Sequence, residues 1–126
     1  MNNLQTHVLG YLETLGFNFL DKADNYLTAD KAGFGGTHDT LQIWTPFRSE
    51  DEDIPQIERR LLRDFETRTK QYPNASRWIV ADTFGGFSQN FRSEAESKFG
   101  LKFRVLFNSL IHPLSLKSSL KLHLPR

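Results

Sequence analysis

The stretch Gly33-Phe34-Gly35-Gly36-Thr37-His38-Asp39, followed after Thr40 by Leu41-Gln42-Ile43-Trp44, decides the fold of this chain. Its three glycines supply the positive φ angles that a tight connection between two strands needs. They predict a hairpin in which residues 26–31 pair antiparallel with residues 40–45. Pro46 ends the second strand, because proline cannot donate a hydrogen bond to a neighbouring strand.

On the N-terminal side of the hairpin, apolar residues recur at helical spacing from Leu4 to Leu15, and Gly16 stands where a helix often ends. This pattern predicts an amphipathic helix over residues 3–15. The alternation of residues 17–19 then predicts an extended segment, and residues 21–25 have the polar composition of a turn.

On the C-terminal side, Pro55 in the first helical turn and the apolar series from Ile54 to Phe65 predict a helix that reaches Gln71. The same segment carries a run of basic residues between positions 59 and 70. Acidic residues precede this run, which complements the helix dipole, so we interpret it as a solvated helix face in preference to a phosphate-binding surface.

Two strands and a further helix complete the prediction. The continuous apolar run of residues 78–81 is typical of a central strand that helices cover on both faces. Ser88 can cap a helix that Gly100 ends, and the alternation of residues 102–107 predicts an edge or near-edge strand.

The predicted order is helix, two or three antiparallel strands, helix, strand, helix, strand. It favours a single three-layer α/β domain over residues 1–107, with α+β as the alternative class. The sheet would be mixed, with four to five strands, an antiparallel hairpin and flanking helices. Residues 108–126 are rich in Leu and Ser and have no clean period, which predicts a basic tail that is either flexible or the start of a further domain.

Composition excludes several classes of function. The 126 residues contain no cysteine, so disulfides, thiolate metal sites and cysteine nucleophiles are excluded. A long apolar run and an N-terminal signal pattern are both missing from the sequence, which favours a soluble protein in the cytoplasm without membrane contact.

The net charge of +1 conceals an asymmetry between the two ends of the chain. Residues 97–126 carry six basic and no acidic residues, whereas residues 1–96 carry ten basic against fifteen acidic residues. A basic end can contact phosphate, but these dispersed charges lack interleaved aromatic residues and favour a solvated end over a nucleic-acid contact.

Three polar residues at element ends are candidate ligand-binding residues, and each also has a structural interpretation. Asp39 after the glycine-rich turn can bind a metal ion or stabilise the turn. His38 can act as a ligand or be polar surface. Asp82 follows the apolar strand, where open α/β sheets bind ligands, yet aspartates there also cap turns. Neither the glycine-rich segment of residues 33–36 nor Gly85-Gly86 continues into a phosphate-binding Gly-Lys-Ser/Thr motif.

The order of elements over residues 3–82 resembles the core of the restriction-endonuclease-like superfamily of PD-(D/E)XK nucleases. The resemblance implies an aspartate at the start of the second hairpin strand and a Glu or Gln, one residue, then Lys further along it. These groups would bind a divalent ion and position water for phosphodiester hydrolysis. Asp39 matches the aspartate and Gln42 the Glu/Gln position, whereas Trp44 occupies the lysine position.

Two hypotheses of different classes follow. The leading one is a noncatalytic recognition or protein-interaction module without a cofactor, which would serve as the N-terminal domain of a larger protein and bind a protein partner or a further domain. The alternative is a Mg²⁺-dependent nuclease in which Asp39 binds the metal ion with Gln42 and Glu13, and Lys31 on the neighbouring strand replaces the missing lysine. Convergence of Asp39, Lys31 and an acid in one cleft would favour the nuclease. Asp39 engaged with its own turn, with Trp44 buried over it, would favour the module.

A third hypothesis is assembly through an exposed sheet edge at residues 102–107, or through the tail.

Overall fold

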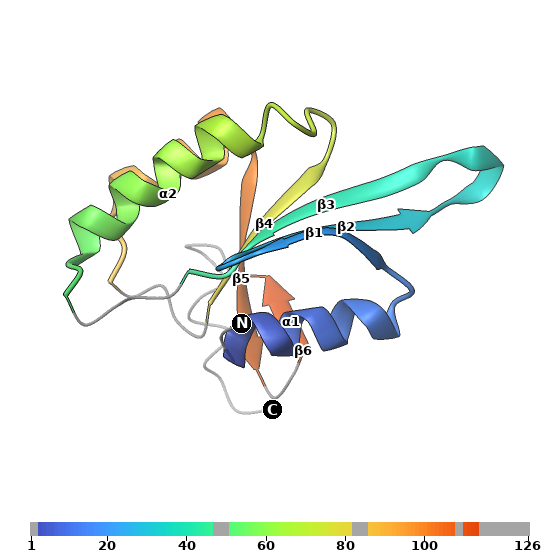
Figure 1. Ribbon diagram of the computed structural model, residues 1–126. Helices are drawn as coiled ribbons and strands as arrows, with labels where there is room; N and C mark the ends of the chain where they lie inside the picture. The colour runs from blue at the N-terminus through green and yellow to red at the C-terminus, as the bar shows by residue number, and fades with distance from the viewer. Residues whose placement is uncertain (1–2, 47–50, 82–85, 108–109, 114–126) are drawn as a thin grey trace.

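The computed structural model describes residues 3–46, 51–81, 86–107 and 110–113 (Figure 1). The elements, in chain order, are α1 (Asn3–Thr14), β1 (Asn18–Ala23), β2 (Tyr26–Ala32), the short 3₁₀ helix η1 (Phe34–Gly36), β3 (His38–Trp44), α2 (Ile54–Arg68), β4 (Ser76–Ala81), α3 (Gln89–Phe99), β5 (Leu101–Phe107) and β6 (Leu110–Pro113). None of the three described helices has the apolar length that a bilayer crossing requires.

The strands form one mixed sheet in the order β1-β2-β3-β4-β5-β6. Strand β2 pairs antiparallel with both β1 and β3, strands β3, β4 and β5 run parallel, and β6 pairs antiparallel with β5. Helix α1 covers one face of the sheet, and α2 and α3 cover the other (Figure 1). The predicted α/β domain with a mixed sheet and an antiparallel hairpin is therefore confirmed.

Local sequence signals set the limits of the helices on the second face. Asp53 and Gln56 form a reciprocal capping box at the start of α2, with both hydrogen bonds at 2.9 Å. The Ser88 hydroxyl accepts a hydrogen bond from the Phe91 amide at the start of α3, and Gly100 ends that helix with φ of 70°. Both ends of α3 lie where the sequence predicted them.

Two parts of the sheet differ from the prediction. Strand β1 continues to Ala23, so the predicted turn over residues 21–25 shrinks to Asp24 and Asn25, the latter with φ of 65°. Asp21 and Lys22 have turn-like polarity because they lie exposed on an edge strand.

The second difference is at the opposite edge, where β6 adds a strand beyond the four to five that were predicted. It occupies the edge beside β5, so assembly by strand addition to residues 102–107 was a wrong expectation. Residues 110–113 were assigned to the tail because a four-residue strand ending in proline has too few residues to show a period. The remainder of the predicted tail, residues 114–126, lies outside the described residues.

The core consists of two clusters separated by the sheet. Along β3, Leu41 and Ile43 point toward α1, whereas Trp44 packs beneath α2 and α3. Since successive strand residues alternate between faces, Gln42 shares the α2 side with Trp44, and Asp39 points to the α1 side. This alternation determines which of the predicted site residues can meet.

Candidate functional site

Gln42 lies in the core, fully buried, and its side-chain amide has partners at both ends. The amide nitrogen donates to the Tyr26 hydroxyl at 2.9 Å and to the Arg68 carbonyl at 2.8 Å, and the amide oxygen accepts from Nε of Arg77 at 3.0 Å. Because both N–H donors and the oxygen are engaged, the side chain links β2, β3, β4 and α2. The structure thus places Gln42 in a structural network.

Arg77 extends this network to the ends of two helices. Its guanidinium donates to the carbonyls of Phe99 at the end of α3 and of Thr69, Tyr72 and Pro73 after α2, at 2.9–3.2 Å. Burial lowers the pKa of Arg77. Burial likewise raises the pKa of Tyr26, whose hydroxyl also accepts from Thr28 at 2.6 Å.

Trp44, at the position where the resemblance implies a lysine, is buried and anchored. Its indole Nε1 donates to the Asp64 carboxylate at 2.7 Å, and the same carboxylate accepts from Nε of Arg68 at 2.9 Å. The Arg68 guanidinium lies 4.1 Å from the centre of the Tyr26 ring. Trp44 is therefore buried, but on the face of the sheet opposite to Asp39.

The β2–β3 hairpin extends beyond the rest of the sheet (Figure 1). Pairing with β1 reaches only as far as Asp30, and pairing with β4 begins only at Leu41. Residues 31–39, which we call the hairpin arm, therefore pair only with each other within the described part of the chain, and all nine are exposed. Phe34 at the tip is 99% exposed, the largest value among the described large apolar side chains.

Short-range hydrogen bonds hold the hairpin arm in shape. At its base, Asp30 pairs with Nδ1 of His38 at 2.8 Å and accepts from the Thr40 hydroxyl at 3.1 Å. At its tip, the Gly33 amide donates to the Thr37 carbonyl at 2.8 Å, and the Thr37 hydroxyl donates to the Phe34 carbonyl at 2.8 Å. These hydrogen bonds connect the two sides of the hairpin.

The structure brings some of the predicted site residues together and separates others. Lys31 and Asp39 are direct cross-strand partners on the arm, and the Lys31 ammonium lies 5.7 Å from the centre of the Phe17 ring. His38 turns to the other face, toward Asp30. Gln42 and Asp39 lie on opposite faces of the sheet, because three positions separate them along one strand.

Two candidates that the sequence suggested remain. Glu13 lies exposed on α1, and Asp82 lies outside the described residues. Within residues 3–46, 51–81, 86–107 and 110–113, no three His, Cys, Asp or Glu side chains are grouped in a way that could hold a metal ion.

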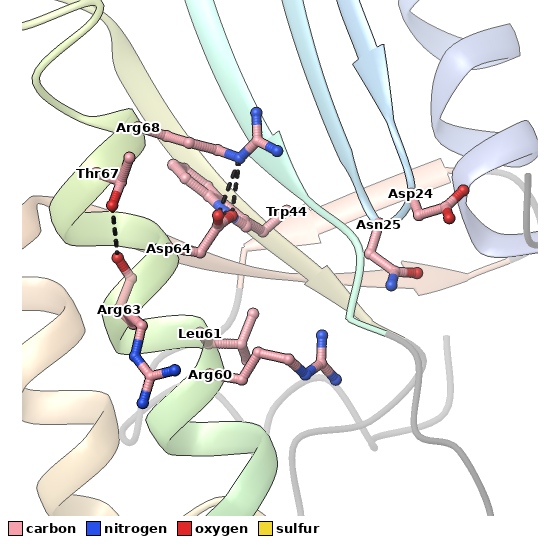
Figure 2. Close-up of a pocket in the computed structure, with 9 residues that line it drawn as sticks. All are labelled: Asp24, Asn25, Trp44, Arg60, Leu61, Arg63, Asp64, Thr67 and Arg68. Carbon is pink, nitrogen blue, oxygen red and sulfur yellow. Dashed lines mark hydrogen bonds and ion pairs between the residues drawn. The ribbon is translucent and has the colours of Figure 1, made fainter.

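The sequence interpretation missed a cleft of about 320 Å³ between α2 and the β1–β2 turn (Figure 2). Its lining residues are Asp24, Asn25, Trp44, Arg60, Leu61, Arg63, Asp64, Thr67 and Arg68. The arginines belong to the run that was interpreted as a solvated helix face. Arg60, Asp64 and Arg68 are spaced one helical turn apart, which was the signal for this cleft in the sequence. That signal was not sufficient, because the opposite wall of the cleft comes from residues about forty positions earlier in the chain.

Two of the arginines in this cleft are held by acidic partners. Arg60 donates to both carboxylate oxygens of Glu52 at 3.0 Å, and Arg68 donates to Asp64 one helical turn away. These pairs fix the guanidinium groups in place while the cleft stays open between α2 and the turn (Figure 2).

The chain matches no family model, no curated protein and no solved structure.

Proposed function

We propose that this chain is a noncatalytic α/β recognition module that binds a protein partner through its hairpin arm. The observation that carries the proposal is Phe34, which is 99% exposed at the tip of an arm that projects from the sheet. Burying a phenylalanine side chain against a partner contributes about 1.5–3 kcal/mol. Such a side chain, presented alone at a tip, is suited to anchor an interface.

The order of the arm supports the same proposal. A flexible loop loses conformational entropy when it binds, whereas the Asp30–His38 pair and the hydrogen bonds of Thr37 already fix the arm. The exposed Lys31 and Asp39 beside the tip would supply the polar rim that surrounds an apolar anchor. The partner would be a separate protein or a further domain of the same protein, in the cytoplasm.

The nuclease alternative has less support. Lys31 and Asp39 do face each other across one rung of the hairpin, as that alternative requires. However, Gln42 is on the other face, and its amide is engaged with Tyr26, Arg68 and Arg77. A nuclease would therefore have to draw its second metal ligand from elsewhere, and a Mg²⁺ titration followed by NMR of the arm amides would detect it.

Site-specific photocrosslinking tests the recognition module directly. The photoreactive amino acid p-benzoylphenylalanine would replace Phe34 in the cell that makes the protein, and replace Leu20, 55% exposed on β1, as the matched control. We expect a discrete crosslinked product from position 34 that is missing from position 20. Unlabelled protein should compete for that product, and the Phe34→Ala variant should not. Identical patterns from both positions, or equal competition by Phe34→Ala, would contradict the proposal.

A further inference from the structure

Arg104 on β5 carries a positive charge that has no counter-ion among the described residues. Its guanidinium forms no hydrogen bond or ion pair with them, and its Nε is buried without a partner. The other two guanidinium nitrogens are not buried in this way, so they remain accessible. Burial of the group lowers the pKa of Arg104, because water solvates this charge incompletely. A charge that is partly removed from water attracts a nearby anion more strongly than an exposed charge does.

Trp78 on the neighbouring strand β4 holds this guanidinium in place. The Arg104 Cζ lies 5.2 Å from the centre of the Trp78 ring. Both side chains lie on the α1 side of the sheet, since Trp78 packs against the cluster beneath α1, and Val80, the cross-strand partner of Arg104, belongs to that cluster. The ring contact orients the planar guanidinium before a ligand binds, which reduces the entropy that binding costs.

Lys102 supplies a second cation on the same face of β5. It precedes Arg104 by two positions, so the two side chains point to one side of the strand and start about 7 Å apart. Lys102 pairs directly opposite Trp78 and is exposed. In the part of the chain that the structure describes, neither Lys102 nor Arg104 forms an ion pair. The two charges are therefore available to one ligand.

Both cations line a cleft of about 400 Å³ beside the first half of β5. Among the described residues, the lining has one carboxylate, that of Glu96, against these two cations. The apolar lining residues Leu101 and Phe103 are 2% and 4% exposed, so a ligand would contact mainly the polar groups. A water molecule takes up about 30 Å³ in the liquid, so the cleft has room for a hydrated phosphate group.

We infer that Arg104 and Lys102 bind a phosphate group in this cleft. A phosphate group has enough acceptor oxygens to engage the guanidinium and the ammonium at the same time, whereas a carboxylate has only two oxygens and a single charge. The group would belong to a free phosphate or phosphomonoester, or to the backbone of a single-stranded nucleic acid. This site is separate from the hairpin arm and does not depend on the proposed function.

An NMR titration of the whole chain with sodium phosphate tests this inference, with the Nε–Hε signal of Arg104 as the reporter. Sodium chloride keeps the ionic strength constant, because exposed charges respond to salt. We expect a saturable shift of this signal and of the backbone amides of residues 101–104. Arg104→Gln, followed through those amides, should weaken phosphate binding by about tenfold or more.

Two further variants make the test independent of the folding of Arg104→Gln. Lys102→Gln changes an exposed side chain and should also weaken phosphate binding. Arg59→Gln is the matched control, since it removes one positive charge from an exposed position of α2, which covers the other face of the sheet. Phe34→Ala should bind phosphate as the wild-type protein does, so a failure of this site and a failure of the recognition module can be told apart.

The outcomes are distinct. A missing phosphate-dependent shift, an equal shift with sodium acetate, or equal weakening by Lys102→Gln and Arg59→Gln would overturn the inference. A second titration uses an oligothymidylate of about ten nucleotides, a length within the range of single-strand binding sites. If it binds through Arg104 and Lys102 more tightly than phosphate, the phosphate group belongs to a nucleic acid. If it binds more weakly while phosphate binds, the ligand is a free phosphate or a phosphomonoester.

Discussion

Replacing Gln42 with leucine removes three hydrogen bonds from the interior at nearly constant volume. The lost bonds are those to the Tyr26 hydroxyl, the Arg68 carbonyl and Nε of Arg77. Tyr26 keeps Thr28 and the Arg68 carbonyl keeps the Gln71 amide, whereas Nε of Arg77 loses its acceptor and the rest of that guanidinium stays bonded. The cost is therefore the loss of three bonds, of which the one to the charged guanidinium is the largest.

Two neutral bonds contribute about 0.5–1.5 kcal/mol each and the charged one about 1.5–3 kcal/mol. The buried leucine recovers about 1–2 kcal/mol of apolar burial. We expect Gln42→Leu to lower the free energy of unfolding by about 2–4 kcal/mol, which is a large share of the stability of a small domain. With a urea m value of about 1–3 kcal/mol/M, the urea concentration at the midpoint of unfolding should fall by about 1–2 M, and the m value should stay the same.

Urea denaturation followed by far-UV circular dichroism measures this change, and a double-mutant cycle with Tyr26→Phe tests its origin. The two changes share one hydrogen bond, so their combined effect should be smaller than the sum of the single effects. If Gln42→Leu cost less than about 0.5 kcal/mol, or if the two changes added fully, the network would not stabilise the domain in the way argued above.

Three further predictions concern the exposed side chain of Phe34, the N-terminal cap of α2 and the buried hydroxyl of Tyr26. Phe34→Ala should change the free energy of unfolding by no more than about 0.5 kcal/mol in urea denaturation, because the exposed ring adds nothing to the core; a larger loss would show that the arm packs against the body. Asp53→Ala removes the cap of α2 and should cost about 1 kcal/mol, whereas Asp51→Ala, two residues earlier and exposed, should be neutral. Burial raises the pKa of Tyr26 above 10.0, so the folded state holds this proton more tightly than the unfolded state. Its contribution to stability is complete below the unfolded pKa and is lost as the pH rises through the folded pKa. Absorbance titration should show Tyr26 ionising at a pH above 10.0, and Tyr26→Phe should remove that step.

The parts of the fold that local chemistry determines could be predicted from the sequence. Asp53, Ser88 and Gly100 act on amides or carbonyls within four residues, so they mark the ends of their helices without knowledge of the fold. The hairpin was predictable for the same reason, since Gly35 and Gly36 adopt φ of 69° and 79°.

The parts that depend on distant contacts could not be predicted. Arg77 has partners at positions 42, 69, 72, 73 and 99, and no local pattern relates these positions. Gln42 matched the Glu/Gln position of the nuclease pattern, but its amide oxygen has a buried partner that is 35 residues away in the chain. The cleft was missed because its two walls meet only in the folded chain.

Arg77 has a consequence for how the domain unfolds. Its guanidinium ties the C-terminal ends of α2 and α3 to the centre of the sheet, so this side chain acts as a noncovalent crosslink in a chain without cysteine. When either helix frays from that end, it breaks a bond to a guanidinium group that also holds the other helix. The two helices and the central strands should therefore open as one cooperative unit, and their slowest-exchanging amides should share a single opening free energy.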